Sequence, residues 1–94
     1  MNNNKPCLYF HSDAGHGWLA IPRKRLKEMG LLNKISSCSY QRGGTVYLEE
    51  DCDMALYLNA IPKDELEWIK ARGFRESYKG SSPIRNYELF RIDK

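Results

Sequence analysis

The chain has 94 residues, which suits one small domain, and folding a chain of this length buries roughly 65% of its unfolded surface. Hydrophobic residues make up 41% and charged residues 29%, a balance that argues against collagen-like, wholly disordered and coiled-coil chains. Fifteen basic and 12 acidic side chains give a net charge of +3, well short of the basic stripe of a dedicated nucleic-acid binder. Charge alone therefore names no partner.

Apolar patterning and cysteine usage indicate the compartment. No apolar run approaches the roughly 18 residues that cross a bilayer, and the polar start over residues 1–5 lacks the pattern of a signal peptide. Cys7, Cys38 and Cys52 form no CxxC pair, and their odd number favours reduced thiols over a disulfide framework. We expect a cytoplasmic protein without membrane contact, with residues 1–6 as a flexible tail.

The first third of the chain predicts a hairpin and a helix. Cys7–His11 and Trp18–Ile21 are β-prone runs, and they flank a polar, glycine-bearing loop over 12–17. Pro22 suits the first position of a helix and Gly30 supplies a stop, so we expect a short helix over 22–29 that buries one narrow stripe.

A second hairpin has the clearest signal. The runs Ile35–Arg42 and Thr45–Glu49 flank Gly43-Gly44, and glycine accepts the positive φ angles of a tight turn. This turn sets Tyr40 opposite Tyr47 and Arg42 opposite Thr45. Period-2 alternation then divides the side chains into a core face with Ile35, Val46 and Leu48 and an opposite face with Cys38, Tyr40, Arg42 and Tyr47.

The remaining chain predicts two helices and a last extended segment. Carboxylates ahead of an apolar run indicate a helix over Cys52–Ala60, and Pro62 with Gly73 brackets another over 62–71. A turn over residues 79–83 precedes Ile84–Ile92, which is either a strand or an ordered extension. We expect a single small α+β domain, with an antiparallel sheet built from hairpins and two or three short helices packed on one side.

Several strings support a resemblance that covers most of the chain: Trp18-Leu19-Ala20-Ile21-Pro22, Lys34-Ile35-Ser36, Ser39-Tyr40-Gln41-Arg42-Gly43, Val46-Tyr47-Leu48-Glu49-Glu50-Asp51-Cys52-Asp53 and Ser82-Pro83-Ile84-Arg85. In these the chain resembles small proteins of bacterial mobile elements and phages to which no activity is assigned. The resemblance implies an accessory factor that binds a host component. It transfers no catalytic residue.

Two clusters have side chains that metals accept. His11, Asp13 and His16 converge on the first hairpin loop, and Cys7 in the preceding strand is a fourth candidate zinc ligand, although the spacing matches no zinc pattern. These residues either bind a metal ion, or His11 ends a strand while Asp13 and His16 lie in the turn without a metal. The acidic run Glu49, Glu50, Asp51 and Asp53 has ligand types that suit Mg²⁺ or Ca²⁺ but lacks the calcium-loop pattern, and helix capping explains at least two of these residues with no further assumption.

The motifs of common enzymes are missing. No serine lies in a GxSxG elbow, and the glycine pairs lack the partner residues of nucleotide-binding loops. A thiolate of one cysteine could pair with His11 or His16, and only spatial proximity decides this. We expect no cofactor and, on balance, no enzyme.

Two surfaces are candidates for partner binding. Tyr40 and Tyr47 beside Arg42 form an aromatic strand face, which either anchors a partner or stabilises the sheet as a cross-strand pair. The first helix adds the basic side chains Arg23, Lys24, Arg25 and Lys27. The leading hypothesis is a non-catalytic protein that binds a host or phage protein. The alternatives are a nucleic-acid binder that uses both surfaces and a small metal-dependent enzyme at His11, Asp13, His16 or the acidic run.

Overall fold

Two hairpins form the centre of the sheet in the computed structural model, which describes residues 8–93. β1 (Tyr9–Ser12) pairs with β2 (Gly17–Pro22), and β3 (Tyr40–Arg42) pairs with β4 (Thr45–Glu49), both antiparallel. β2 and β4 then join the hairpins side by side, again antiparallel. The expectations for Cys7 and for a tail over 1–6 lie outside the described residues.

Two short strands complete the sheet at its edges. β5 (Arg75–Tyr78) runs parallel to β1, and β6 (Glu88–Leu89) runs antiparallel to β3, which gives the order β5-β1-β2-β4-β3-β6. We expected an antiparallel sheet. The sheet is mostly antiparallel, but the pairing of β1 with β5 is parallel. The long stretch with helices between β1 and β5 permits the parallel pairing, which a tight turn does not.

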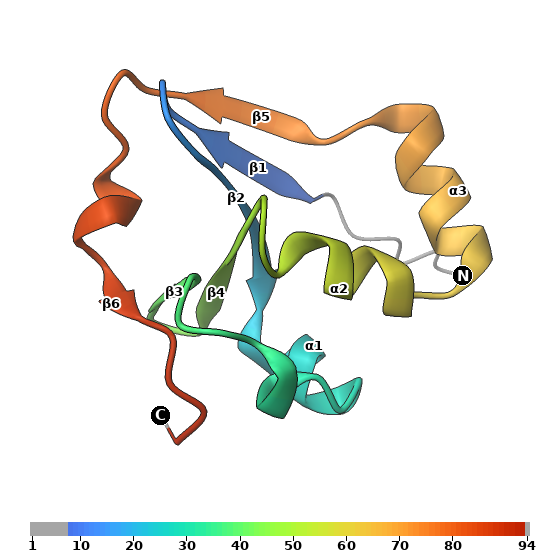
Figure 1. Ribbon diagram of the computed structural model, residues 1–94. Coiled ribbons are helices and arrows are strands. Elements are labelled where there is room, and N and C mark those ends of the chain that lie inside the picture. Colours follow the sequence, from blue (N-terminus) through green and yellow to red (C-terminus); the bar gives the residue numbers. More distant parts are fainter. Residues whose placement is uncertain (1–7, 94) are drawn as a thin grey trace.

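Three helices cover one face of the sheet (Figure 1). They are α1 (Arg23–Glu28), α2 (Met54–Ala60) and α3 (Lys63–Arg72), each beginning one or two residues after the start that the sequence suggests. Pro22 and Pro62 occupy the position before the first helical residue. No helix within residues 8–93 is long and apolar enough to span a membrane.

The core lies between the helices and the sheet. Leu19, Ile21, Val46 and Leu48 alternate along β2 and β4 toward the helices, and each is fully buried. The helices contribute Leu26, Tyr57 and Ile69 to the same cluster. Burying one such side chain contributes about 2 kcal/mol, so this alternation fixes which face of the sheet the helices cover. The predicted core positions Val46 and Leu48 are confirmed.

The turn at Gly43-Gly44 has the predicted register. Tyr40 lies opposite Tyr47, and Arg42 lies opposite Thr45. Gly43 has a positive φ of 59°, and Gly44 does not have a positive φ. A positive φ at the first central residue alone is the pattern of a type II′ hairpin turn.

The strand before this turn is shorter than expected. β3 begins at Tyr40 instead of Ile35, and a 3-10 turn, η1 (Leu32–Lys34), precedes it. The buried carboxylate of Asp53 accepts hydrogen bonds from the Ser36 hydroxyl at 2.8 Å and the Ser39 hydroxyl at 2.6 Å. These bonds hold the backbone in a bend, because short hydroxyl side chains compete with ladder pairing. Asp53 precedes α2 but makes no side-chain capping bond, so the capping expectation is wrong there.

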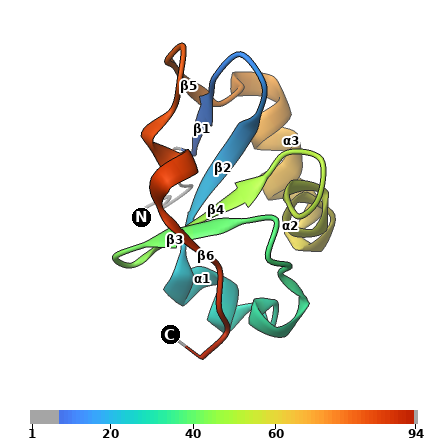
Figure 2. The same ribbon diagram turned by 60° about the vertical axis from the view of Figure 1, so that its left-hand side comes forward.

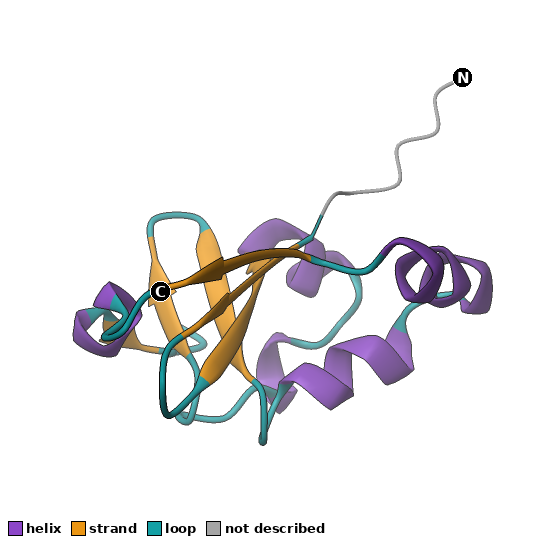
Figure 3. Ribbon diagram, turned by 90° about the horizontal axis from the view of Figure 1, so that it is seen from above, coloured by secondary structure: helices purple, strands orange, loops and turns teal. Residues whose placement is uncertain are grey.

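The C-terminal segment crosses the face of the sheet that the three helices leave open. It contains a 3-10 turn, η2 (Pro83–Asn86), which lies in front of the central strands in Figure 2 and across the sheet from α2 and α3 in Figure 3. The Ser82 hydroxyl accepts a hydrogen bond from the Ile84 amide and caps this turn. The expected C-terminal strand thus reduces to the two residues of β6.

Candidate functional site

The sheet face opposite the helices, called here the outer face, carries most of the candidate residues. Alternation along the strands directs Tyr9, His11, Trp18, Tyr40 and Tyr47 to this side. Arg42 shares the parity of Tyr40 and is exposed, while Tyr40 and Tyr47 are half-buried. The predicted grouping of Tyr40, Arg42 and Tyr47 on one face, away from the helical core, is confirmed.

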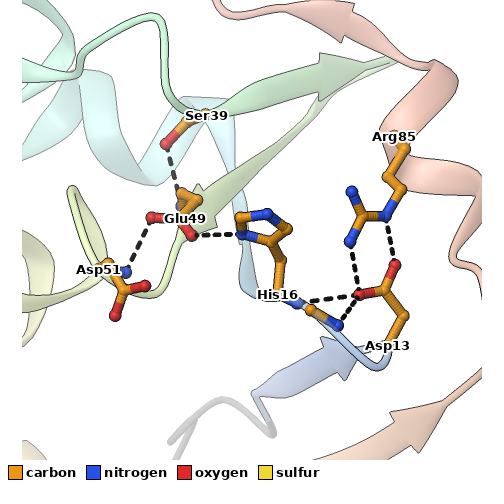
Figure 4. A network of polar contacts seen from close by, with 7 residues as sticks. Asp13, His16, Ser39, Glu49, Asp51 and Arg85 are labelled. Carbon is orange, nitrogen blue, oxygen red and sulfur yellow. Dashed lines mark hydrogen bonds and ion pairs between the residues drawn. The ribbon is translucent and has the colours of Figure 1, made fainter.

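An ion pair fastens the C-terminal segment to the outer face. The Asp13 carboxylate accepts a hydrogen bond from Arg85 Nη2 at 2.9 Å and a second from Arg85 Nε, as Figure 4 shows. It also accepts from the amides of Gly15, His16 and Ser82. The Arg85 guanidinium and these amides hold the pKa of Asp13 well below its usual range. Asp13 is therefore an ionised anchor for the loop and for η2.

Aromatic rings form a continuous row along the outer face. The His11 ring centroid lies 6.5 Å from that of Tyr9 and 5.9 Å from that of Tyr47, and Tyr87 lies 5.2 Å beyond Tyr47. The Arg42 guanidinium stacks 5.0 Å above the Tyr87 ring. The row joins β1, β4 and the C-terminal segment into one surface with a cation at its end.

A cavity of about 190 Å³ opens beside this row, and we call it the outer-face cavity. Its walls come from β1, β4, β5 and the C-terminal segment, namely His11, Ser12, Tyr47, Ser77, Lys79, Ser82, Pro83, Ile84 and Tyr87. Within the described residues no carboxylate belongs to this lining. Burial lowers the pKa of His11, so its imidazole is neutral at neutral pH, and Lys79 supplies the positive charge.

A second, smaller hollow lies beside Trp18. It measures about 70 Å³, and its lining includes His16, Cys38, Tyr40 and Arg85. Trp18 is 1% exposed because Tyr40, His16 and the Arg85 guanidinium, 5.8 Å from its ring, cover it. Its indole N–H makes no hydrogen bond within residues 8–93. Trp18 is thus the buried floor of the outer face, a role that the sequence did not reveal.

Lys24 and Lys27 of the first helix lie away from this face, whereas Arg23 lines a hollow together with Arg42 and Glu88. Arg23 donates to Gln41 Oε1 at 3.0 Å and to the carbonyl oxygens of Arg91 and Ile92, so its guanidinium fastens the chain end. Lys24 and Lys27 are exposed on α1, whose Leu26 packs into the core on the other side of the sheet. The exposed lysines of the basic helix are therefore separated from the aromatic strand face, while Arg23 adjoins the Arg42 end of that face.

The three metal candidates have separate roles. His11 lines the outer-face cavity, Asp13 binds Arg85, and His16 Nδ1 lies 3.2 Å from Glu49 Oε2 (Figure 4). In the part of the chain that the structure describes, no group of three or more His, Cys, Asp or Glu side chains has the arrangement of a metal site. The structure does not bring His11, Asp13 and His16 together.

The acidic run after β4 also makes structural contacts. Glu49 accepts from the Asp51 amide at 2.8 Å, and its own amide donates to the Ser39 hydroxyl. The Cys52 thiol lies in contact with Cys38 and Glu49, which raises the pKa of Cys52 to about 12. These contacts connect β4 to the bend before β3, and a thiol that stays protonated is a poor nucleophile.

Comparison with family models, curated proteins and solved structures finds no match for the chain. Function must therefore be argued from the outer face itself. Sequence reasoning identified Tyr40, Arg42 and Tyr47 but missed Ser77, Lys79 and Tyr87, which lie 30 or more residues along the chain from Tyr47. Arg75–Tyr78 has no apolar/polar alternation that would indicate a strand, and no local pattern reveals that it pairs with β1.

Proposed function

We propose that this protein is a non-catalytic binding protein that contacts a partner protein through the outer face. The observation that carries the proposal is the aromatic row, which remains half-exposed, ends in the exposed Arg42 and borders a cavity. Tyrosine and arginine are enriched among the residues that dominate the binding energy of protein interfaces. Tyrosine buries a large area with only two χ angles to fix, and the planar guanidinium of arginine both stacks on rings and donates several hydrogen bonds. The resemblance to proteins of phages and mobile elements supports an accessory factor that acts on a host or phage protein.

The geometry favours a protein over a nucleic acid. Base stacking needs ring faces open to solvent, whereas Tyr47 meets His11 at 65° and Tyr87 at 58° and so packs edge against face. The η2 turn also crosses the sheet and interrupts a flat platform (Figure 2). Lys24 and Lys27, which a phosphate backbone would use, belong to the other side of the sheet.

The side chains that could act as a base or nucleophile are held by other groups, which favours binding over catalysis. A general base must be free to reach a substrate proton, but Asp13 is saturated by Arg85 and backbone amides. His16 pairs with Glu49, and the Cys52 thiol has a raised pKa. The outer face supports recognition because its cations stand beside aromatic rings. Arg42 stacks on Tyr87, and Lys79 lines a cavity that has no carboxylate among its described lining residues. These charges favour a partner with an acidic segment.

The test compares two single-cation variants in a direct binding assay. The partner is recovered by photo-crosslinking from position 9, at the exposed end of the aromatic row, purified, and titrated calorimetrically against the wild type, Arg42→Ala and Lys24→Ala. Arg42→Ala should weaken binding by more than about 1 kcal/mol, roughly fivefold, since arginine at an interface centre is a frequent hot spot. Lys24→Ala removes the same charge from an exposed position on α1 and should leave the affinity unchanged.

Each variant is also melted to separate stability from binding. Both positions are exposed, so stability should change by no more than about 0.5 kcal/mol. Equal affinities for all three proteins would refute the outer face as the interface. Crosslinks to nucleic acid, with a steep loss of binding as salt rises and a stronger effect of Lys24→Ala, would establish the nucleic-acid alternative instead.

A further inference from the structure

The volume of the outer-face cavity limits its occupant to one ring-sized group. At about 190 Å³ it is smaller than the roughly 300–1,000 Å³ of pockets that take drug-sized ligands. A protein cavity of about 150 Å³ is sufficient to bind benzene. The cavity therefore accommodates a single aromatic ring with a small substituent, and not a larger cofactor.

The walls of the cavity are aromatic and aliphatic. Tyr47 and Tyr87 line the cavity together with Pro83 and Ile84 of η2, and Ile84 is 2% exposed. Rings in proteins prefer edge-to-face or offset contacts with other rings, which contribute about 0.5–1.5 kcal/mol beyond the area that they bury. A planar aryl group can make such contacts with Tyr47, Tyr87 and His11.

The rim of the cavity is polar and positively charged. Ser77 and Ser82 belong to this lining and have hydroxyl groups, and the Lys79 amide donates to the Ser12 carbonyl at 3.0 Å, which fixes the backbone of Lys79 beside the cavity. Within residues 8–93 no carboxylate forms an ion pair with Lys79 or lines the cavity. Hydroxyl and ammonium donors without a competing acceptor charge favour an anion.

We infer that the outer-face cavity binds one aromatic ring that carries an anionic group, with the ring between Tyr47, Tyr87 and Ile84 and the anion at Lys79 and the serine hydroxyls. This inference rests on the proposed function in one respect: the ring belongs to the acidic segment of the partner protein. The same chemistry occurs in free aryl carboxylates and phosphates, which serve as probes and as the alternative source.

The experiment is a two-dimensional NMR titration of the full chain with small probes. Phenylacetate and phenyl phosphate are the anionic rings, benzyl alcohol the neutral ring, benzylamine the cationic ring, and acetate the anion without a ring. We expect saturable shifts at Ser77, Lys79 and Tyr87 with the anionic rings in the millimolar range. Benzylamine should bind about tenfold more weakly than phenylacetate, since one exposed charge changes from attraction to repulsion, and acetate should not saturate.

Two variants with one control separate charge from shape. Lys79→Gln should lower the affinity for phenylacetate about threefold to fivefold and leave that for benzyl alcohol unchanged, while Lys24→Gln on α1 should change neither. Ser77→Leu places an aliphatic side chain into the cavity and should abolish binding of every ring. Ser77 is half-buried in an edge strand, and a thermal melt checks that this variant folds.

The outcomes that overturn the inference differ from those that overturn the proposed function. The inference is refuted if no aryl probe shifts the lining residues, or if benzylamine binds as tightly as phenylacetate. If Ser77→Leu abolishes probe binding but the partner still binds in an Arg42-dependent way, the cavity is not the partner's anchor and the outer face remains the interface. If aryl acids bind saturably but Arg42→Ala leaves partner binding unchanged, the inference about the cavity is supported and the proposed interface is refuted.

Discussion

At the scale of a single residue, burial in the outer face lowers the pKa of His11. Its imidazole lies between Tyr9 and Tyr47 and is half-buried, and burial lowers its pKa from the ordinary value of 6.5. The folded protein therefore favours the neutral imidazole, and His11 binds a proton more readily in the unfolded chain than in the folded one. A group of this kind contributes stability above the unfolded pKa and loses that contribution as pH falls through the unfolded pKa to the folded one.

His11→Phe tests this assignment. The variant keeps an aromatic ring in the row but has no titrating group, so its free energy of unfolding should fall less than that of the wild type between about pH 7.5 and pH 5. Because the ring is partly solvated, we expect the two profiles to diverge by about 0.5 kcal/mol or less, measured by urea unfolding at each pH. Above pH 7.5 the difference between the two proteins should stay constant, and parallel profiles over the whole range would contradict the assignment.

At the scale of elements, the turn between β3 and β4 depends on one glycine more than on the other. Gly43 has a positive φ of 59°, which an L-residue with a Cβ adopts at a cost, whereas Gly44 does not have a positive φ. A Cβ at either position has no atom within 4 Å, so steric clash does not separate them. Backbone conformation alone should decide the outcome.

Gly43→Val should therefore lower the free energy of unfolding by about 1–2 kcal/mol, and by more if the β-branched side chain strains the turn further. Gly44→Val should cost no more than about 0.5 kcal/mol, and it is the matched control because the substitution and the solvent exposure are the same. Chemical unfolding of both variants measures the difference. Equal losses would show that the turn does not have the conformation described here.

The elements that the sequence predicts well are the ones with local causes. Gly43-Gly44 between two β-prone runs indicated the hairpin and its register. A proline at the start and a glycine after the end located α1 and α3, and carboxylates ahead of an apolar run located α2, each start to within two residues. Elements with distant causes were missed. The strand before Tyr40 is cut short by Asp53, more than ten residues away, and the parallel pairing of β5 with β1 has no local signature. The cavity was missed for the same reason, since Ser77, Lys79 and Tyr87 join Tyr47 only through the sheet.

At the scale of the whole molecule, the ion pair between Asp13 and Arg85 holds η2 against the outer face of the sheet. The three helices need no such tie, because their apolar side chains fill the core. The η2 turn buries mainly Ile84, and its polar connection to the sheet runs through Asp13, Ser82 and Arg85. The chain beyond η2 is held separately, by the pairing of β6 with β3 and by Arg23. Figure 4 shows that this pair adjoins the contact between His16 and Glu49, so the loop before β2 connects the C-terminal segment to β4. The outer-face cavity lies between the sheet and this segment and should exist only while the segment is docked.

Asp13→Asn tests that dependence. The amide still accepts hydrogen bonds from the Gly15 and His16 amides but loses the charge that binds Arg85, so the loop should persist while the C-terminal segment detaches more often. Hydrogen exchange should accelerate at least several-fold over residues 82–87 and change little at Leu19 and Val46 in the core strands, because local opening and global unfolding have different free energies. Asp51→Asn, on an exposed side chain of the neighbouring turn, is the control and should leave both regions unchanged. Exchange that accelerates equally in the core and in the segment would mean that the segment is an integral part of one cooperative unit. In that case the outer-face cavity cannot open without the whole domain.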